Sequence, residues 1–103
     1  MIDVSAVKNE LNITYETDLA IEQRLSGILR RSEAIIREYA GIGEDEPFDD
    51  ADEELILNLC RYIWNGAYED FARNFASELL LLRAKYAVKE VGENGDEEAG
   101  EIP

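Results

Sequence analysis

The chain has 103 residues and a formal net charge of −14 at pH 7, from 24 acidic and 10 basic residues. This length fits a single domain, and such a negative charge disfavours binding to nucleic-acid phosphates and to anionic membranes. The chain has no histidine and only one cysteine, Cys60, which excludes an intrachain disulfide and the usual ligand sets of a zinc site.

The chain begins with a short helix, predicted over residues 2–13. Asp3 is placed to act as its N-cap, because an aspartate side chain accepts hydrogen bonds from the first backbone amides. The start has neither a basic region nor a long apolar run, so we predict no signal peptide and no membrane span, and a cytoplasmic protein. Helical spacing of the apolar positions supports the helix: Val4, Val7 and Leu11.

A long amphipathic helix is predicted over residues 18–40, after a turn in which Thr14 and Thr17 are candidate caps. Gly41 is its natural C-cap, since glycine adopts the left-handed conformation without steric cost. Ser32 lies in the middle of its apolar stripe. We interpret Ser32 as a small residue that lets a neighbouring helix approach, with its hydroxyl bonded to its own backbone.

An acidic loop is predicted over residues 44–52. Asp49, Asp50 or Asp52 can cap the following helix, and Asp50 with Glu53 fits a capping box. The carboxylates also complement the positive end of the helix dipole. The run lacks the alternating spacing and central glycine of a calcium-binding EF-hand, so we predict no metal site here.

The central element is a helix predicted over residues 52–71, which is apolar on more than one side and is therefore covered on more than one side. Cys60 lies in its middle and is predicted to be buried in a reducing compartment. Residues 72–76 either break the helix or continue it, and a third main helix follows over 77–91. Residues 92–103 are acidic and glycine-rich, which predicts a flexible tail.

The predicted fold is thus an all-α domain, residues 1–91, of three main helices plus a short N-terminal helix. The helices 18–40 and 52–71 should pair antiparallel across the acidic loop. A domain this small cannot bury every face of the central and last helices, so we predict that another copy covers part of this surface. The alternative is that the last helix folds back and is fully covered within the monomer. The predicted subunit interface consists of Arg24, Arg31, Trp64, Tyr68, Phe71, Leu81 and Leu82.

The arginines suggest how two copies meet. Arg24 and Arg31 flank one edge of the apolar stripe of helix 18–40, while residues 44–54 hold acids but no base. An arginine edge of one copy could face the acidic loop of the next and give a head-to-tail contact, which closes into a ring when the rotation permits. The alternative is that these arginines make ordinary pairs along their own helix or lie over its apolar surface.

Catalysis is not predicted. An enzyme needs a base, a nucleophile or a metal in a pocket, and the paired carboxylates Asp49 and Asp50 are better explained as helix caps. We predict no cofactor, no metal and no catalytic residue. A second class of function stays open, namely a small acidic helical binding module that mimics DNA or inhibits a nucleic-acid-binding enzyme.

The order of these segments resembles the small head–tail connector, or adaptor, proteins of tailed bacteriophages and prophages, which are also known as DNA-packaging proteins. Five features carry the resemblance over nearly the whole chain: VKNELNI at residues 7–13, Asp18, LSGILRRSEAIIREYAGI at 25–42, CRYIWNGAYEDF at 60–71 and the helix at 79–86.

The resemblance implies a structural role without catalysis. Members of this family assemble as a dodecameric-type ring under the portal, extend the DNA channel and present a docking face. The implied partners are further copies of the chain, the portal protein and the next connector or tail protein, with no membrane. DNA would pass through without sequence-specific binding, which an acidic surface suits because it does not hold phosphates. The implied location is the bacterial host cytoplasm during assembly and then the neck of the virion.

Overall fold

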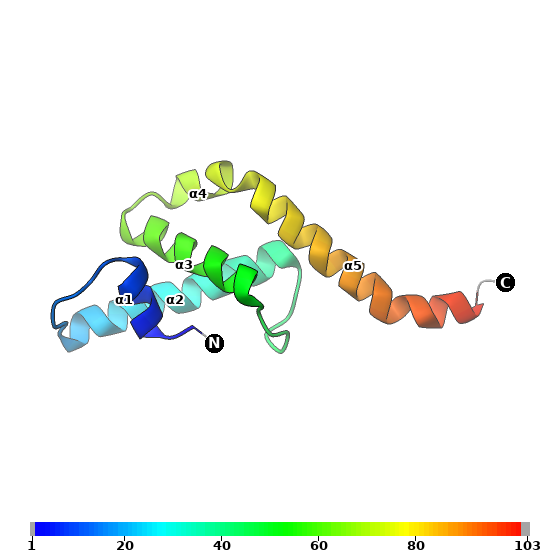
Figure 1. The fold of residues 1–103 in the computed structure, drawn as a ribbon, viewed down its shortest axis with the longest axis horizontal. Coiled ribbons are helices and arrows are strands. Elements are labelled where there is room, and N and C mark those ends of the chain that lie inside the picture. The colour runs from blue at the N-terminus through cyan, green and yellow to red at the C-terminus, as the bar shows by residue number, and fades with distance from the viewer. Residues whose placement is uncertain (1, 102–103) are drawn as a thin grey trace.

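The computed structural model describes the backbone of residues 2–101 and the side chains of residues 2–88 (Figure 1). The described residues contain no strand, so the predicted all-α class is confirmed. The span of the last helix includes residues 92–101, where the sequence predicts a tail; the side chains there lie outside the described residues, and the tail stays a prediction. The helices are α1 (Val4–Glu10), α2 (Leu19–Ala40), α3 (Asp50–Trp64), α4 (Tyr68–Asn74) and α5 (Ala76–Glu101).

Helices α2 and α3 form the centre of the domain. Figure 1 shows them side by side and running in opposite directions, joined by the loop that carries the acidic residues. Helix α1 packs against both, and α5 packs against α2 before it extends away from the rest of the domain. The predicted antiparallel pairing of these two helices is therefore present in the structure.

The core draws residues from every helix. Helix α3 supplies three apolar side chains with no exposed surface, as expected for a helix that is covered on several sides. Complete burial of an aliphatic side chain contributes roughly 1.5–3 kcal/mol, so these positions carry much of the stability of a small domain. The core residues are Val7, Leu25, Ile28, Leu29, Ile36, Ala40, Ile56, Leu59, Cys60, Phe71, Leu79, Leu82 and Tyr86.

Cys60 and Ser32 meet where α3 packs on α2. Both side chains are fully buried, and the Cys60 thiol donates a hydrogen bond to the Ser32 hydroxyl at a sulfur–oxygen distance of 3.4 Å. Burial raises the pKa of the Cys60 thiol, because the charged thiolate is poorly solvated there. The burial predicted for Cys60 is confirmed, and the small Ser32 side chain lies at the helix contact as predicted.

The central helix is shorter than predicted. The sequence predicts a continuous helix over residues 52–71, whereas α3 ends at Trp64 and α4 begins at Tyr68. Gly66 lies between them with a φ of 70°, in the left-handed region that ends a helix. The chain turns there, and α4 then places the Phe71 ring in the core.

Two of the helix ends follow the sequence closely and one differs. Asp3 caps α1 by accepting from the Ala6 amide at 3.0 Å, and Gly41 ends α2 with a φ of 73°, both as predicted. The cap of α2, however, is Asp18 rather than Thr14 or Thr17. Thr17 does not cap the helix because its hydroxyl donates instead to the Glu22 carboxylate at 2.7 Å.

Candidate subunit interfaces

The start of α3 is fixed by a reciprocal pair of carboxylates. Asp49 is the N-cap and accepts from the Asp52 amide at 2.9 Å, while the Asp52 carboxylate accepts from the Asp49 amide at 3.2 Å. This is a capping box, but it lies one residue before the predicted pair of Asp50 and Glu53. Because Asp52, rather than Glu53, is the second member of the capping box, the Asp52 side chain points into the protein interior.

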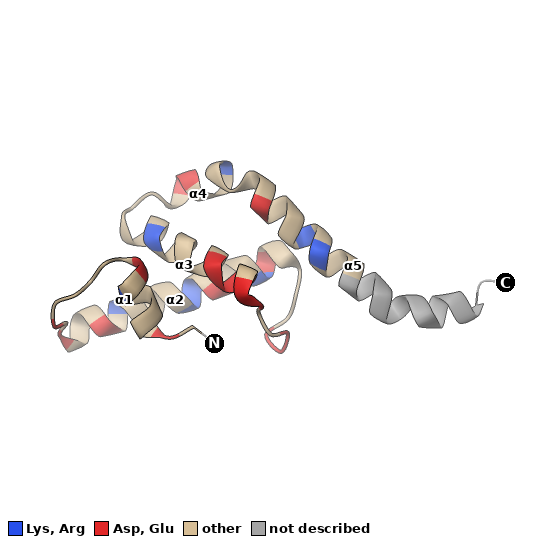
Figure 2. Ribbon diagram, in the orientation of Figure 1, with Lys and Arg blue, Asp and Glu red and all other residues tan. Residues whose placement is uncertain are grey.

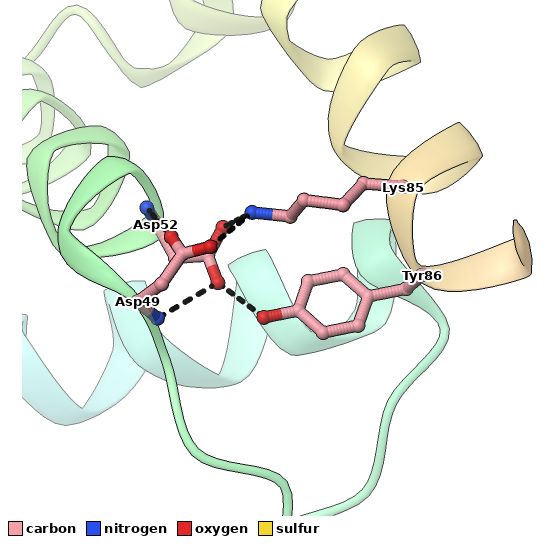
Figure 3. A network of polar contacts seen from close by, with 4 residues as sticks. All are labelled: Asp49, Asp52, Lys85 and Tyr86. Atoms are coloured by element: carbon pink, nitrogen blue, oxygen red, sulfur yellow. Dashed lines mark hydrogen bonds and ion pairs between the residues drawn. The ribbon is translucent and has the colours of Figure 1, made fainter. Parts of the chain in front are cut away.

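Asp52 has no exposed surface and is held by two residues of α5 (Figure 3). The Lys85 ammonium lies 2.7 Å from the Asp52 carboxylate and 2.7 Å from the Asp49 carboxylate. The Tyr86 hydroxyl donates a hydrogen bond to the second oxygen of Asp52. A buried carboxylate is costly unless it is paired and hydrogen-bonded, so this network favours one placement of α5 against α3.

The electrostatics of the network agree with this geometry. The hydrogen bond from Lys85 lowers the pKa of Asp49, with help from the Asp52 backbone amide. Burial acts against the charge of Lys85, but the hydrogen bonds to Asp49 and Asp52 outweigh it and raise the pKa of Lys85. Burial and the bond to the Asp52 carboxylate also raise the pKa of Tyr86. Near neutral pH, Lys85 therefore carries its charge and Tyr86 stays protonated as a donor.

Helix α5 is apolar on two sides. Its inner side buries Leu79, Leu82 and Tyr86 against the domain. On the opposite side Leu80, Leu81 and Val88 are 70%, 69% and 72% exposed. Ala84 and Ala87 are exposed between them. We call the exposed side the outer face of α5: Leu80, Leu81, Ala84, Ala87 and Val88.

A groove runs beside this face, between α3 and α5. Its volume is about 480 Å³, and Leu55 of α3 and Leu82 of α5 contribute apolar surface to it. Leu81 belongs both to the groove and to the outer face of α5. The exposed apolar surface therefore continues from α5 toward α3, and contiguous surface of this kind usually marks a partner site.

A second surface combines arginine and aromatic side chains. The Arg24 guanidinium lies 4.8 Å from the centre of the Trp64 ring, and the Arg31 guanidinium lies 5.0 Å from the centre of the Tyr68 ring. Each such contact contributes about 0.5–1 kcal/mol at an exposed site. Both arginines come from α2, while the rings come from the end of α3 and the start of α4. We call these four residues the arginine–aromatic surface.

The structure thus divides the seven predicted interface residues into three groups. Arg24, Arg31, Trp64 and Tyr68 come together as the arginine–aromatic surface, and Leu81 is exposed on α5. The prediction is wrong for two residues, which belong to the core instead: Phe71 is 1% exposed and Leu82 is 4% exposed.

Both corrections have a physical cause. The turn at Gly66 directs the Phe71 ring inward, where it stacks on Phe75 at 4.7 Å between ring centres and meets the edge of Tyr62 at 5.6 Å. Leu82 lies three residues after the buried Leu79, on the same side of α5. Its neighbour Leu81 is rotated about 100° around the helix axis and therefore faces solvent.

The network around Asp52 is what sequence reasoning missed. The sequence predicts Asp52 only as a candidate cap and does not connect it with Lys85. The two are separated by 33 residues, so no local spacing pairs them. The only sequence signal is a lysine and a tyrosine adjacent to each other in a helix that is otherwise rich in leucine.

Three further findings concern metal binding, membrane spans and similarity to known proteins. Among the residues that the structure describes, no group of three or more acidic or cysteine side chains is arranged to hold a metal ion. Within the same residues, no helix combines the length and the apolar character needed to cross a membrane. Comparison with known protein families, curated proteins and solved structures finds no match to this chain.

The first prediction concerns Tyr86→Phe. At pH 7 the variant should unfold about 1–2 kcal/mol more easily, because a buried carboxylate loses a donor. The raised pKa of Tyr86 means that, above its ordinary value of about 10, the unfolded chain releases this proton while the folded chain keeps it. Wild-type stability should therefore fall as the pH rises above about 10, and less steeply in the variant. Urea unfolding of wild type and of Tyr86→Phe, at pH 7 and at a pH above about 10, measures both effects.

The control is Tyr15→Phe, because Tyr15 is 60% exposed. It should leave the free energy of unfolding within about 0.5 kcal/mol of wild type at both pH values. Equal stability of Tyr86→Phe and wild type at pH 7 would mean that the network does not hold α5.

The second prediction compares two neighbouring leucines. Leu82→Asp places a carboxylate in the core and should destabilise the fold by more than about 3 kcal/mol. Leu81→Asp changes an exposed position, so helix content and thermal stability should stay close to wild type while self-association weakens. Circular dichroism with sedimentation velocity separates the two effects. Unfolding of the Leu81 variant, or association equal to wild type, would remove Leu81 from the interface.

Proposed function

We propose that this chain is a structural subunit of a tailed-phage or prophage head–tail connector. In this role, copies form a ring under the portal that extends the DNA channel. The observation that carries the proposal is the outer face of α5, where Leu80, Leu81 and Val88 are each about 70% exposed although the opposite side of the helix is already buried. None of the described side chains covers this face, and contiguous exposed apolar surface of this kind usually marks a site where another chain binds.

Ring formation adds a second requirement. In a head-to-tail contact two different patches of the same chain meet, and the contact closes into a ring when the rotation between copies permits it. The arginine–aromatic surface is cationic and the acidic loop 44–52 is anionic, so the chain carries two unlike patches that can meet. The outer face of α5 adds exposed apolar surface and is held in place by the buried Asp52 network.

The identity of the assembly rests on the resemblance of residues 7–13, 25–42 and 60–71 to connector sequences. The partners proposed with it are the portal protein and the next connector or tail protein. The role is structural, not enzymatic. Negative charge around a DNA channel would keep DNA from adhering, since cationic side chains are what bind phosphates.

Native mass spectrometry over a concentration series, with negative-stain images of the most concentrated sample, tests this proposal. We expect closed rings of roughly a dozen copies, as head-to-tail closure requires. The Leu81→Asp variant is the matched control and should shift toward the monomer at equal concentration. A wild-type chain that stays monomeric throughout the series would contradict the proposal of self-assembly.

A further inference from the structure

The loop between α2 and α3 presents two carboxylates that have no partner among the described residues. Glu44 and Asp45 are exposed, and neither takes part in an ion pair or hydrogen bond within the part of the chain that the structure describes. Figure 2 shows this acidic segment at the tip of the loop, beyond the end of α2. The loop therefore offers negative charge to a neighbour rather than to its own domain.

Arg37 holds this loop in place. Its guanidinium donates to the backbone carbonyl of Gly43 and to that of Glu46, both at 2.7 Å, and lies 4.1 Å from the centre of the Phe48 ring. The two carbonyls bracket Glu44 and Asp45 in the sequence. Their backbone is thus anchored on both sides, which reduces the conformational freedom that binding would have to remove.

The arginine–aromatic surface is the matching positive site. Arg24 and Arg31 each lie over a ring, and neither makes an ion pair with a described residue. A ring covers one flat side of a guanidinium, while the N–H donors in its plane stay available for a carboxylate. The two arginines are seven residues apart on one helix, about 10 Å along its axis. The surface therefore offers two separate positions for carboxylates.

Within one chain these two sites cannot meet. Arg31 lies nine residues before Ala40, the end of α2, so the helix separates it from the loop by about 13 Å along its axis. Arg24 lies two turns further away. The loop is held back on α2 by Arg37, and α2 is continuous from Leu19 to Ala40. Glu44 and Asp45 can therefore reach an arginine–aromatic surface only on another molecule.

We propose that the arginine–aromatic surface of one copy binds Glu44 and Asp45 of a second copy. The inference rests on the proposed self-assembly and names the contact that sets its direction. Because the two patches differ, each copy can receive one neighbour and offer its loop to another, so the contact propagates head to tail. It also places positive charge against negative charge between copies that otherwise repel each other through a net charge of −14.

Charge reversal tests the contact. One variant carries Arg24→Glu with Arg31→Glu, and a second carries Glu44→Arg with Asp45→Arg. Each alone should need at least tenfold more protein for half-assembly, because like charges then face each other. An equimolar mixture should recover assembly, since every contact between the two variants again joins opposite charges. Mass photometry gives the assembled fraction, and circular dichroism confirms that each variant is folded.

The matched control is Arg30→Glu compared with Arg31→Glu. The two positions are adjacent on α2 and change the charge equally, but Arg30 has no aromatic partner among the described residues. Arg31→Glu should weaken assembly and Arg30→Glu should not. Wild-type assembly should also weaken at 1 M salt, where the screening length is about 3 Å.

The outcomes separate this inference from the proposed function. Rings that form in wild type and persist in both reversed variants overturn this contact and leave the connector proposal standing. Reversed variants that fail to assemble even when mixed also overturn it, because the arginines and the loop then act on different partners. A wild-type chain that never assembles overturns the contact and the proposed self-assembly together.

Discussion

The placement of α5 depends on one buried carboxylate. Asp52 begins as part of a local helix cap and ends as the partner of Lys85 and Tyr86, far along the chain. Burying a carboxylate completely is costly unless it is paired and hydrogen-bonded in this way. The same interaction that satisfies Asp52 therefore fixes the helix that carries the exposed Leu80, Leu81 and Val88.

This constraint explains how one helix serves both the fold and the assembly. Leu79, Leu82 and Tyr86 complete the core from one side of α5, and the bond to Asp52 sets the rotation of the helix about its axis. With the rotation fixed, Leu80 and Leu81 face outward. A helix packed by apolar contacts alone could rotate more freely, and the outer face would then be less well defined.

The sequence predicts well those features that depend on residues close together in the chain. Asp3 and Gly41 end their helices as expected, because caps depend on residues only a few positions away. The break at Gly66 was missed because apolar positions continue across it with helical spacing. The run of leucines from residue 79 to 82 was ambiguous for a different reason: four consecutive apolar residues point in every direction around a helix. Only packing of α5 on the domain decides that Leu82 is core and Leu81 is exposed.

The candidate surfaces also combine features that the sequence predicts with features that only the packed structure decides. The predicted interface included Arg24, Arg31, Trp64 and Tyr68, and the structure brings each arginine onto one of the two rings; their role in assembly stays a prediction. The stacking of each guanidinium on one ring, and the anchoring of the acidic loop by Arg37, depend on side-chain geometry that no spacing rule contains.

The central claim is that copies of this chain meet through two unlike patches. Cysteine trapping tests it most directly in a Cys60→Ala background, with Arg31→Cys on one set of copies and Asp45→Cys on another. Because a paired arginine and aspartate keep their Cα atoms farther apart than the about 7 Å that a disulfide allows, a flexible bis-maleimide crosslinker is used to join the two cysteines. We expect a crosslinked dimer in the mixture and little in either variant alone. Equal crosslinking of Arg31→Cys copies with one another would instead show a symmetric contact and would contradict the account.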